Sequence, residues 1–299
     1  MLTITKDHAV YAMDPKNEPA ARVESGAVLC FETEDCFGGQ LKCEEDKMGA
    51  IDWANINPAT GPVFVEGADP GDILKVEILS IQLAPAAVIA DAPGEGVTGC
   101  AITDEATRIL PVENGRVYLS GFWTCPVRPM IGVIGTAPAG KAVPTGTPGP
   151  HGGNMDCKLI GTGTTLYLPV NCEGALLAMG DLHAVMGDGE VAVCGAEIAG
   201  KVTVRVTVVK NALLPTPFLL TEEKAVAIYS APTLDEAAAG ATMAMHSLLC
   251  DVVGLEEHTA GTLLSLAGDV RICQMVDPAR TCRMEFPRRY FEQVGFRFA

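Results

Sequence analysis

The sequence predicts a mainly β protein, built of β-sandwich-like layers with a few helices in the C-terminal third. Apolar and polar residues alternate with a period of two in many short segments, which is typical of half-buried strands. The 299 residues include 32 Gly and 20 Pro, which favour turns between strands. Charged residues make up only 19% of the chain, which is poor for long surface helices.

The expected strands follow from this alternation. Valines 202, 204, 206 and 208 alternate with polar residues, so residues 201–210 form a strand with one face in water. In residues 73–81 the apolar phase changes near Ile78 and Leu79, which predicts a β-bulge. Gly/Pro turns separate these strands, and this order favours a sandwich or barrel. The other expected strands are residues 27–33, 63–66, 165–170, 175–178, 191–196, 225–229 and 270–276.

One strong helix follows the strand at 225–229. Thr233 and Glu236 have the spacing of a capping box, in which each side chain satisfies the other's backbone N–H. Apolar residues then recur at helical spacing from Ala238 to Val252, and Gly254 can end the helix. A second, shorter helix is expected to end at Gly268, after starting near Thr259.

Two long segments rich in Gly and Pro, residues 84–99 and 137–153, are expected to be loops. Loops of this length in a compact protein are often functional. The whole chain, 1–299, is expected to form a single domain. If it divides into two closely packed β subdomains, the boundary lies near 140–155.

Composition also excludes partners. The chain has 21 Lys plus Arg against 37 Asp plus Glu, a net charge of −16, which argues against nucleic acid as a partner. No apolar stretch approaches the roughly 18–20 residues that span a bilayer, so no membrane partner is expected. The 11 cysteines form no C-x-x-C pair, and the first residues lack a basic-then-apolar signal pattern. A reduced, cytoplasmic protein is the expectation.

Polar residues suited to chemistry concentrate in the middle third of the chain. Two histidines and several carboxylates at strand ends are the ingredients of a divalent-metal site. Imidazole with carboxylate suits zinc, and an all-oxygen set suits calcium. The candidates are His151, Asn154, Asp156, Asp181, His183, Asp188, Glu190 and Glu197.

Some of these residues also have purely structural interpretations. Gly187-Asp188-Gly189 is a good hairpin turn by composition, and Asp181 can cap a turn through its own side chain. His183 lies between carboxylates and near glycines, and whether it is a functional or a structural residue is open from this pattern. Cys157 is expected to be a buried structural thiol. No Gly-x-Ser-x-Gly elbow and no His-Glu-x-x-His motif occurs.

Several unusual strings occur in one order along nearly the whole chain. The central ones are HGGNMD at 151–156, TLYLPV at 165–170, GDLHA at 180–184 and GDGE at 187–190. Others are FETEDC at 31–36, GQ at 39–40, NPATGPV at 57–63, GADPGD at 67–72 and GDVRICQ at 268–274. Together they resemble the acetamidase/formamidase family. One departure is Gly26-Ala27, where the family often has Gly-Asp before a strand; we interpret it as a turn substitution.

The resemblance implies an amidohydrolase that acts on a short aliphatic amide, formamide or acetamide, and releases ammonia and a carboxylic acid. It also implies a mostly β fold, a homo-oligomer such as a dimer or tetramer, and a divalent metal, Zn or Ca, near the active site. The Glu-Lys-Cys chemistry of nitrilase-type amidases belongs to a different fold and is not implied.

Roles among these residues are assigned as a hypothesis. Asp35, Asp156 and His183 would hold a divalent ion, with Asp181 or Glu197 as a ligand or close neighbour. The ion would polarise the amide carbonyl for attack by water.

The remaining site residues would act on protons and on the substrate. Glu190 would take a proton from water and pass it to the leaving amine. His151 and Asn154 would hydrogen-bond the substrate or the developing oxyanion.

A small substrate requires a small pocket. Residues 126–130 and 145–150 are expected to form an apolar wall, with Trp123 or Phe122 limiting chain length; Trp123 as a core residue is an equal alternative. Two other functions stay open: a non-catalytic metabolite- or carbohydrate-binding sandwich, and an oligomer subunit stabilised by calcium.

Overall fold

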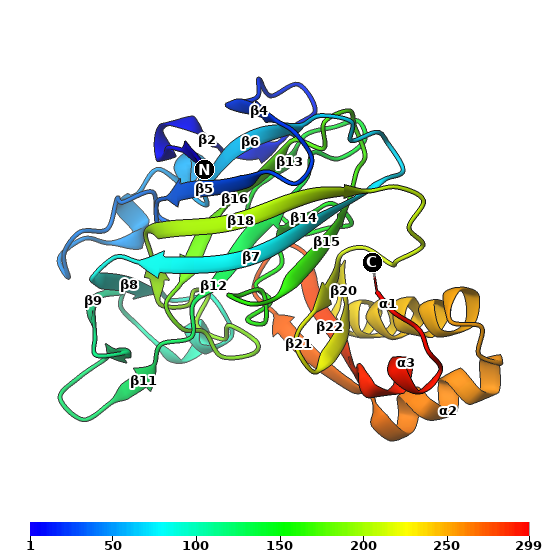
Figure 1. The fold of residues 1–299 in the computed structure, drawn as a ribbon. Coiled ribbons are helices and arrows are strands. Elements are labelled where there is room, and N and C mark those ends of the chain that lie inside the picture. The colour runs from blue at the N-terminus through cyan, green and yellow to red at the C-terminus, as the bar shows by residue number, and fades with distance from the viewer. Residues whose placement is uncertain (299) are drawn as a thin grey trace.

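Two β-sheets make up most of the computed structural model, which describes residues 1–298 (Figure 1). The first sheet has nine strands, in spatial order β1 (Leu2–Ile4), β5 (Val28–Thr33), β18 (Gly200–Val209), β7 (Ile73–Leu83), β15 (Thr165–Pro169), β19 (Phe218–Leu220), β20 (Lys224–Ala231), β22 (Arg280–Pro287) and β21 (Asp269–Gln274). The mainly β prediction is confirmed.

The second sheet has eleven strands. Its main path runs β11 (Thr124–Pro126), β10 (Arg116–Tyr118), β9 (Ala106–Glu113), β8 (Ala86–Asp91), β17 (Glu197–Ile198), β16 (Leu177–His183), β12 (Met130–Gly135) and β14 (Gly152–Asn154). Three strands lie off this path, β6 (Ala59–Val65), β2 (Ala9–Val10) and β4 (Ala21–Val23), with β6 paired to β16. A separate two-stranded ribbon joins β3 (Ala12–Met13) to β13 (Val143–Pro144).

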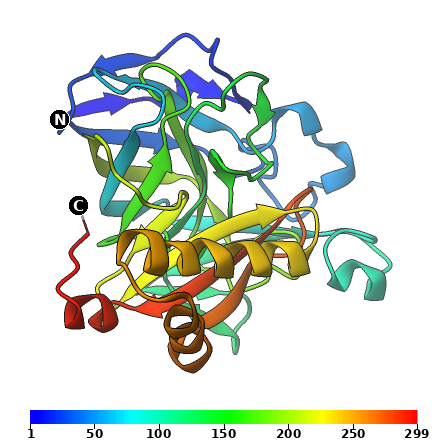
Figure 2. The ribbon, with the colours of Figure 1, turned by 90° about the vertical axis from the view of Figure 1, so that its right-hand side faces the viewer.

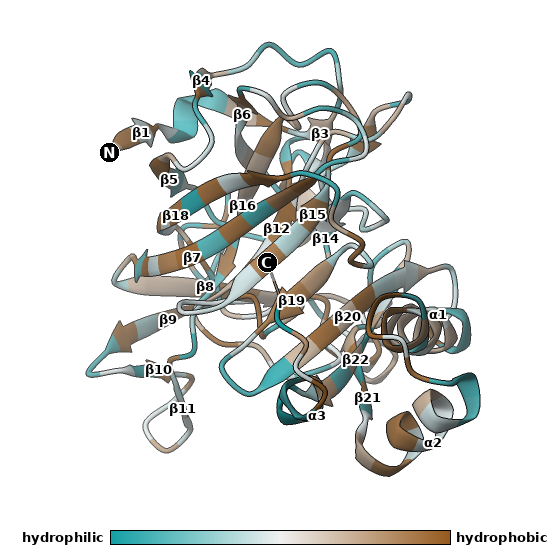
Figure 3. Ribbon diagram, turned by 45° about the vertical axis from the view of Figure 1, so that its right-hand side comes forward, coloured by the Kyte–Doolittle hydropathy of each residue, from teal (hydrophilic) through white to brown (hydrophobic). Residues whose placement is uncertain are grey.

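The two sheets share one hydrophobic core. In β18 the side chains of Val202, Val204 and Val206 are fully buried, while the intervening residues are polar, and Figure 3 shows the alternating colours along β7 and β18. These valines belong to the same buried cluster as Ile131 of β12 and Leu177 of β16. A strand with period-two alternation buries one face only, so two such sheets bury their apolar faces together.

The predicted bulge in β7 is confirmed. Thr203 of β18 pairs with Ser80, but the next residue, Val204, pairs with Ile78, so Leu79 is passed over. Leu79 is exposed while Ile78 is buried, which is why the apolar phase changes in the sequence.

The longer helices gather beside the C-terminal strands. They are α1 (Leu234–Ser247), α2 (Glu257–Ala267) and α3 (Arg289–Gln293), and α1 continues into a π-helical turn, η5 (Leu248–Val252). Figure 2 shows α1 lying across β20 and β22, where Ala241 and Met245 are buried. The capping box of Thr233 and Glu236 is confirmed. Glu256 caps α2, which begins at Glu257, two residues before the expected start.

Two other expectations about local structure are wrong. Residues 191–196 form turns and coil instead of a strand: the Val193 N–H donates back to Glu190, the Ala196 N–H donates to Val185, and the thiol of Cys194 bonds the backbone of Ala90. Residues 84–99 are only partly a loop, since β8 (Ala86–Asp91) lies within them and pairs with β9. The strand expected at 175–178 is β16, which starts later and extends to His183.

The remaining short helices are 3₁₀ turns: η1 (Lys6–His8), η2 (Met48–Ala50), η3 (Trp53–Asn55) and η4 (Thr98–Ala101). Within residues 1–298, no helix has both the length and the apolar character needed to cross a membrane. All 11 cysteines are free thiols.

Candidate active site

A cavity of about 590 Å³ is lined by residues of β14, β16 and β17 of the second sheet, and the polar strings identified in the sequence meet there. Its polar wall contains Asn57, Asn154, Asp181, His183, Glu190, Glu197 and Asp277. Its apolar wall contains Tyr11, Phe37, Met48, Trp53 and Pro144, and Thr145, Gly146 and Thr147 continue the lining. A concave site with an apolar wall and a few convergent polar groups is typical of small-molecule binding.

His183 is the centre of the polar group, and sheet pairing brings its neighbours to it. Asp181 and His183 lie on β16, which pairs with β17 so that His183 stands opposite Glu197. The Nε2 atom of His183 lies 3.1 Å from Oε1 of Glu197, 3.3 Å from Oδ1 of Asp181 and 3.7 Å from Oδ1 of Asp156. Its Nδ1 atom lies 3.9 Å from Oε1 of Glu190. We call these five residues the acidic cluster.

Three carboxylates of the acidic cluster come from left-handed backbone. The φ angles of Asp156, Asp181 and Glu190 are 43°, 54° and 47°. This conformation is uncommon for residues other than Gly, and such residues concentrate at functional sites. With this backbone conformation, the three carboxylates all face the imidazole of His183.

Glycine at position 132 of β12 makes room for two of these carboxylates. A Cβ atom on Gly132 would lie 2.5 Å from both Oδ1 of Asp156 and Oδ2 of Asp181. Real Cβ contacts are essentially never shorter than 3.0 Å, so any side chain there would displace the acids. The close approach of Asp156 and Asp181 therefore requires Gly132.

The acidic cluster is almost entirely buried. The side chains of Asp156, His183 and Glu197 are each 1% exposed. Burial and the charge of Asp181 raise the pKa of Asp156 to about 7, and burial raises the pKa of Glu197 to about 8. Burial, reinforced by Asp156, also raises the pKa of Glu190. Four carboxylates around one imidazole thus repel one another when ionised in the metal-free protein.

His183 and Asp181 form the attractive part of the cluster. Burial alone would lower the pKa of His183, but Glu197 and Asp181 raise it well above its ordinary value. Burial alone would raise the pKa of Asp181, but the charge and hydrogen bond of His183 lower it. One imidazolium can offset one carboxylate, and the remaining acids lack a protein cation among residues 1–298 that contacts them.

Of the other predicted site residues, Asn154 lines the cavity, whereas His151 and Asp35 do not. Asn154 lines it and donates from Nδ2 to Oδ2 of Asp277 at 3.0 Å. His151 is buried outside the cavity lining, and burial lowers its pKa to about 4. Asp35 also lies outside the lining; its carboxylate accepts the Gly39 N–H at 3.1 Å, and burial raises its pKa.

Sequence reasoning missed part of the site. Cys36 and Cys194 line the cavity. A free thiol in such a segment is normally interpreted as a small apolar side chain, so neither cysteine was predicted as a site residue. Asp277 lines it too, and an Asp-Pro pair directly after β21 was the available signal. Of the expected apolar wall, residues 145–147 line the cavity, but residues 126–130 and 148–150 do not. Trp123 and Phe122 are 72% and 94% exposed and also lie outside the lining.

The donor atoms of this site fit a divalent metal. Ligand atoms of Cys36, Asp181 and Glu197 lie within 4.8 Å of one another, and so do those of Asp156, His183 and Glu190. Several buried atoms that could bind a metal make no hydrogen bond within residues 1–298. They are Oδ1 of Asp156, Oδ1 of Asp181, Nδ1 of His183 and Oε2 of Glu197. Buried polar atoms are normally paired, so unpaired ligand atoms gathered in these two adjoining groups suit a cation.

The fold and the site together define a β-sandwich protein with a buried acidic and histidine site of the kind that holds a divalent metal. The sequence profile of the Acetamidase/Formamidase family matches residues 6–143 and 136–293. The chain belongs to this family, as the strings in its sequence predicted.

Solved structures agree over almost the full length. The chain is 47% identical to an acetamidase from Bacillus halodurans, with a TM-score of 0.97 over 98% of this chain and 99% of that one. It is 30% identical to an acetamidase from Yersinia enterocolitica, with a TM-score of 0.92 over 99% and 93%. A formamidase from Methylophilus methylotrophus is 26% identical over 64% of this chain, and the chain spans 61% of that protein's length.

The metal-free protein should become less stable as pH rises from about 5 to 8. Asp156 and Glu197 have higher pKa values folded than unfolded, so the folded chain binds more protons in this range and the free energy of unfolding falls, by up to about 1.4 kcal/mol per pH unit for each group. Urea denaturation of chelator-treated protein at several pH values measures this slope. A bound divalent metal should flatten it; the same slope with and without metal would contradict the assignment.

Replacing Gly132 by Ala should push Asp156 and Asp181 apart, because a Cβ has no space there. We expect a loss of about 1–3 kcal/mol in the free energy of unfolding and at least tenfold weaker metal binding, measured by denaturation and by competition with a chelating dye. Gly187→Ala is the matched control, since a Cβ there meets nothing within 4 Å. Unchanged metal affinity in Gly132→Ala would show that these carboxylates do not bind the metal.

Proposed function

We propose that this protein is an amidohydrolase that converts a short aliphatic amide, formamide or acetamide, and water into ammonia and the carboxylic acid. The observation that carries the proposal is the acidic cluster at the base of a cavity, in a chain that belongs to the Acetamidase/Formamidase family. The names of the related acetamidases and formamidase support the substrate class.

The cluster is proposed to hold zinc, through Asp156, Asp181, His183 and Glu197, with Cys36 as a further donor. A donor set of nitrogen, oxygen and sulfur suits zinc better than calcium, which prefers oxygen alone. A divalent metal bound there supplies positive charge that polarises an amide carbonyl and lowers the pKa of water. Asp35 belongs to the predicted ligand set, but its hydrogen bond to Gly39 leaves it outside the donors that converge.

Glu190 is proposed as the residue that moves the proton. It lies on the cavity wall, next to His183, and burial raises its pKa, so its carboxyl group holds a proton more strongly than that of an exposed glutamate. It takes a proton from the attacking water and delivers it to the amide nitrogen, which otherwise leaves poorly. The products are then ammonia and the acid, with no other reactant needed.

Asn154 is proposed to orient the substrate. Its Nδ2 donates to Asp277, while its Oδ1 is buried and makes no hydrogen bond within residues 1–298. That oxygen can accept an N–H from the substrate amide. His151 contributes no atom to the cavity wall, so a direct substrate contact by His151 is not part of this proposal. A cytoplasmic location and a homodimer or homotetramer complete the proposal.

The test is ammonia release from formamide, acetamide, propionamide and urea. Chelation should abolish release from the two shorter amides and added Zn²⁺ should restore it, with Ca²⁺ as the comparison. Glu190→Gln should lower kcat by about 10²–10⁴. His246→Ala, a histidine on α1 that bonds the backbone of Glu257, is the matched control and should keep full turnover.

Full turnover after chelation, or in Glu190→Gln, would contradict the proposed mechanism. If metal removal only lowered the melting temperature and no amide released ammonia, the metal would be structural and the chain would not be an amidase.

A further inference from the structure

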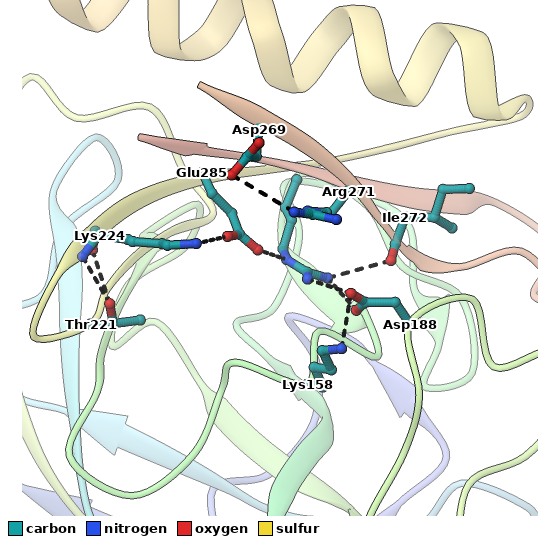
Figure 4. A network of polar contacts seen from close by, with 9 residues as sticks. Lys158, Asp188, Thr221, Lys224, Asp269, Arg271, Ile272 and Glu285 are labelled. Carbon is teal, nitrogen blue, oxygen red and sulfur yellow. Dashed lines mark hydrogen bonds and ion pairs between the residues drawn. The ribbon is translucent and has the colours of Figure 1, made fainter. Parts of the chain in front are cut away.

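A network of ion pairs around the buried side chain of Arg283 lies where the C-terminal strands meet the loop that carries Glu190. The side chain of Arg283, on β22, is 2% exposed. Its Nη1 and Nη2 atoms donate to Oδ1 and Oδ2 of Asp188 at 2.7 and 2.8 Å, and its Nε donates to Glu285 at 2.8 Å. Lys158 lies 2.9 Å from Asp188, and Lys224 bonds Glu285, as the dashed lines in Figure 4 show.

The contacts of Asp188 with Arg283 go beyond the local hydrogen bonds that form a hairpin turn. Asp188 was open to interpretation as a turn residue only, yet it forms a two-point pair with a guanidinium that comes from 95 residues further along the chain. A bidentate pair fixes the orientation of both planar groups. Arg283 itself is fixed by its bond to Glu285 on the same strand. The loop around Asp188 is therefore held to a rigid strand at one defined angle.

The backbone of Gly189, next to Asp188, is hydrogen-bonded to the end of β21. The Gly189 N–H donates to the carbonyl of Cys273 at 2.8 Å, and the Met275 N–H donates to the carbonyl of Gly189 at 3.2 Å. Gly189 thus forms an isolated bridge with Gln274 at the end of β21. The next residue, Glu190, has a left-handed backbone that points its carboxylate to His183.

From these contacts we infer that Arg283 is a positioning residue for the amide hydrolysis, acting through Asp188 on Glu190. Arg283 touches neither the cavity nor the acidic cluster within residues 1–298. It fixes Asp188, and Asp188 with Gly189 fixes the direction from which the Glu190 carboxylate enters the site. The inference rests on the proposed proton-transfer role of Glu190.

The end of β21 also fixes the position of the Asp277 backbone. The buried side chain of Gln274 accepts the N–H groups of Val276 and Asp277 at 2.9 and 3.0 Å and donates to the carbonyl of Ala279 at 2.6 Å. β21 and β22 therefore hold two parts of the cavity wall, one through Arg283 and one through Gln274. Displacing a reacting group by about 1 Å can lower a rate about 10²-fold, so such supports affect kcat directly.

The experiment is a double-mutant cycle between Asp188→Asn and Glu190→Gln, read by steady-state ammonia release. Asp188→Asn should lower kcat by about 10- to 100-fold, with KM changed by less than about threefold, because the misplaced group moves protons and does not bind substrate. In the Glu190→Gln background, Asp188→Asn should change the residual kcat by less than about twofold, since no proton carrier remains to be positioned.

Matched variants separate positioning from folding. Lys158→Met removes the other ion pair of Asp188 but keeps its two-point contact with Arg283, and Arg271→Met removes a nearby exposed pair with Asp269. Both should keep kcat within about twofold of the wild type. Arg283→Lys keeps the charge but loses the fork geometry, so it should behave like Asp188→Asn. Circular dichroism confirms that each variant is folded.

The possible results are distinct. If Asp188→Asn lowers kcat equally in both backgrounds, or leaves it unchanged while Glu190→Gln is slow, Arg283 and Asp188 are structural only and the inference is overturned. If Glu190→Gln is as fast as the wild type, the proposed function of Glu190 fails, and the positioning role fails with it.

Discussion

The carboxylates of Asp156, Asp181, Glu190 and Glu197 surround a single buried imidazole, that of His183. Burying several like charges against one opposite charge is unfavourable unless protons or a cation offset them. The uncommon features of the site follow from this constraint. They include the left-handed backbone at three of the acids, the absence of a side chain at position 132 and the unpaired donor atoms. Part of the formal charge of −16 is located here, where a divalent cation would neutralise it.

The sandwich supplies the rigidity that such a cluster needs. β16 carries Asp181 and His183 and is paired on both sides, with β12 on one side and with β6 and β17 on the other. The end of β21 holds two further parts of the site: Gln274 forms a bridge with Gly189, next to Glu190, and its side chain accepts the N–H of Asp277. Residues from position 11 to position 278 therefore meet at one cavity, which explains why the strings that resemble the Acetamidase/Formamidase family extend over nearly the whole chain.

The sequence predicted the mainly β fold because period two and the turn residues are local properties, and it even located the bulge at Leu79. It also named most of the residues that converge on His183. It predicted Asp35 as a metal ligand, whereas the neighbouring Cys36 lines the cavity. Which of two adjacent side chains faces the site depends on the fold of the segment. Residues 191–196 looked like a strand because tight packing and strand pairing select the same apolar residues. Asp277 and Arg283 act through contacts far apart in the chain, and no local pattern reveals such contacts.

The proposed activity depends on a divalent metal held by the acidic cluster, with Cys36 as a further donor. Anomalous diffraction at the zinc absorption edge, from crystals grown with zinc, tests it most directly. We expect a peak enclosed by His183, Asp181 and Glu197, at about 2.0–2.2 Å from their ligand atoms. Zinc peaks found only at other sites, with the cluster carboxylates bonded to one another through protons, would contradict it.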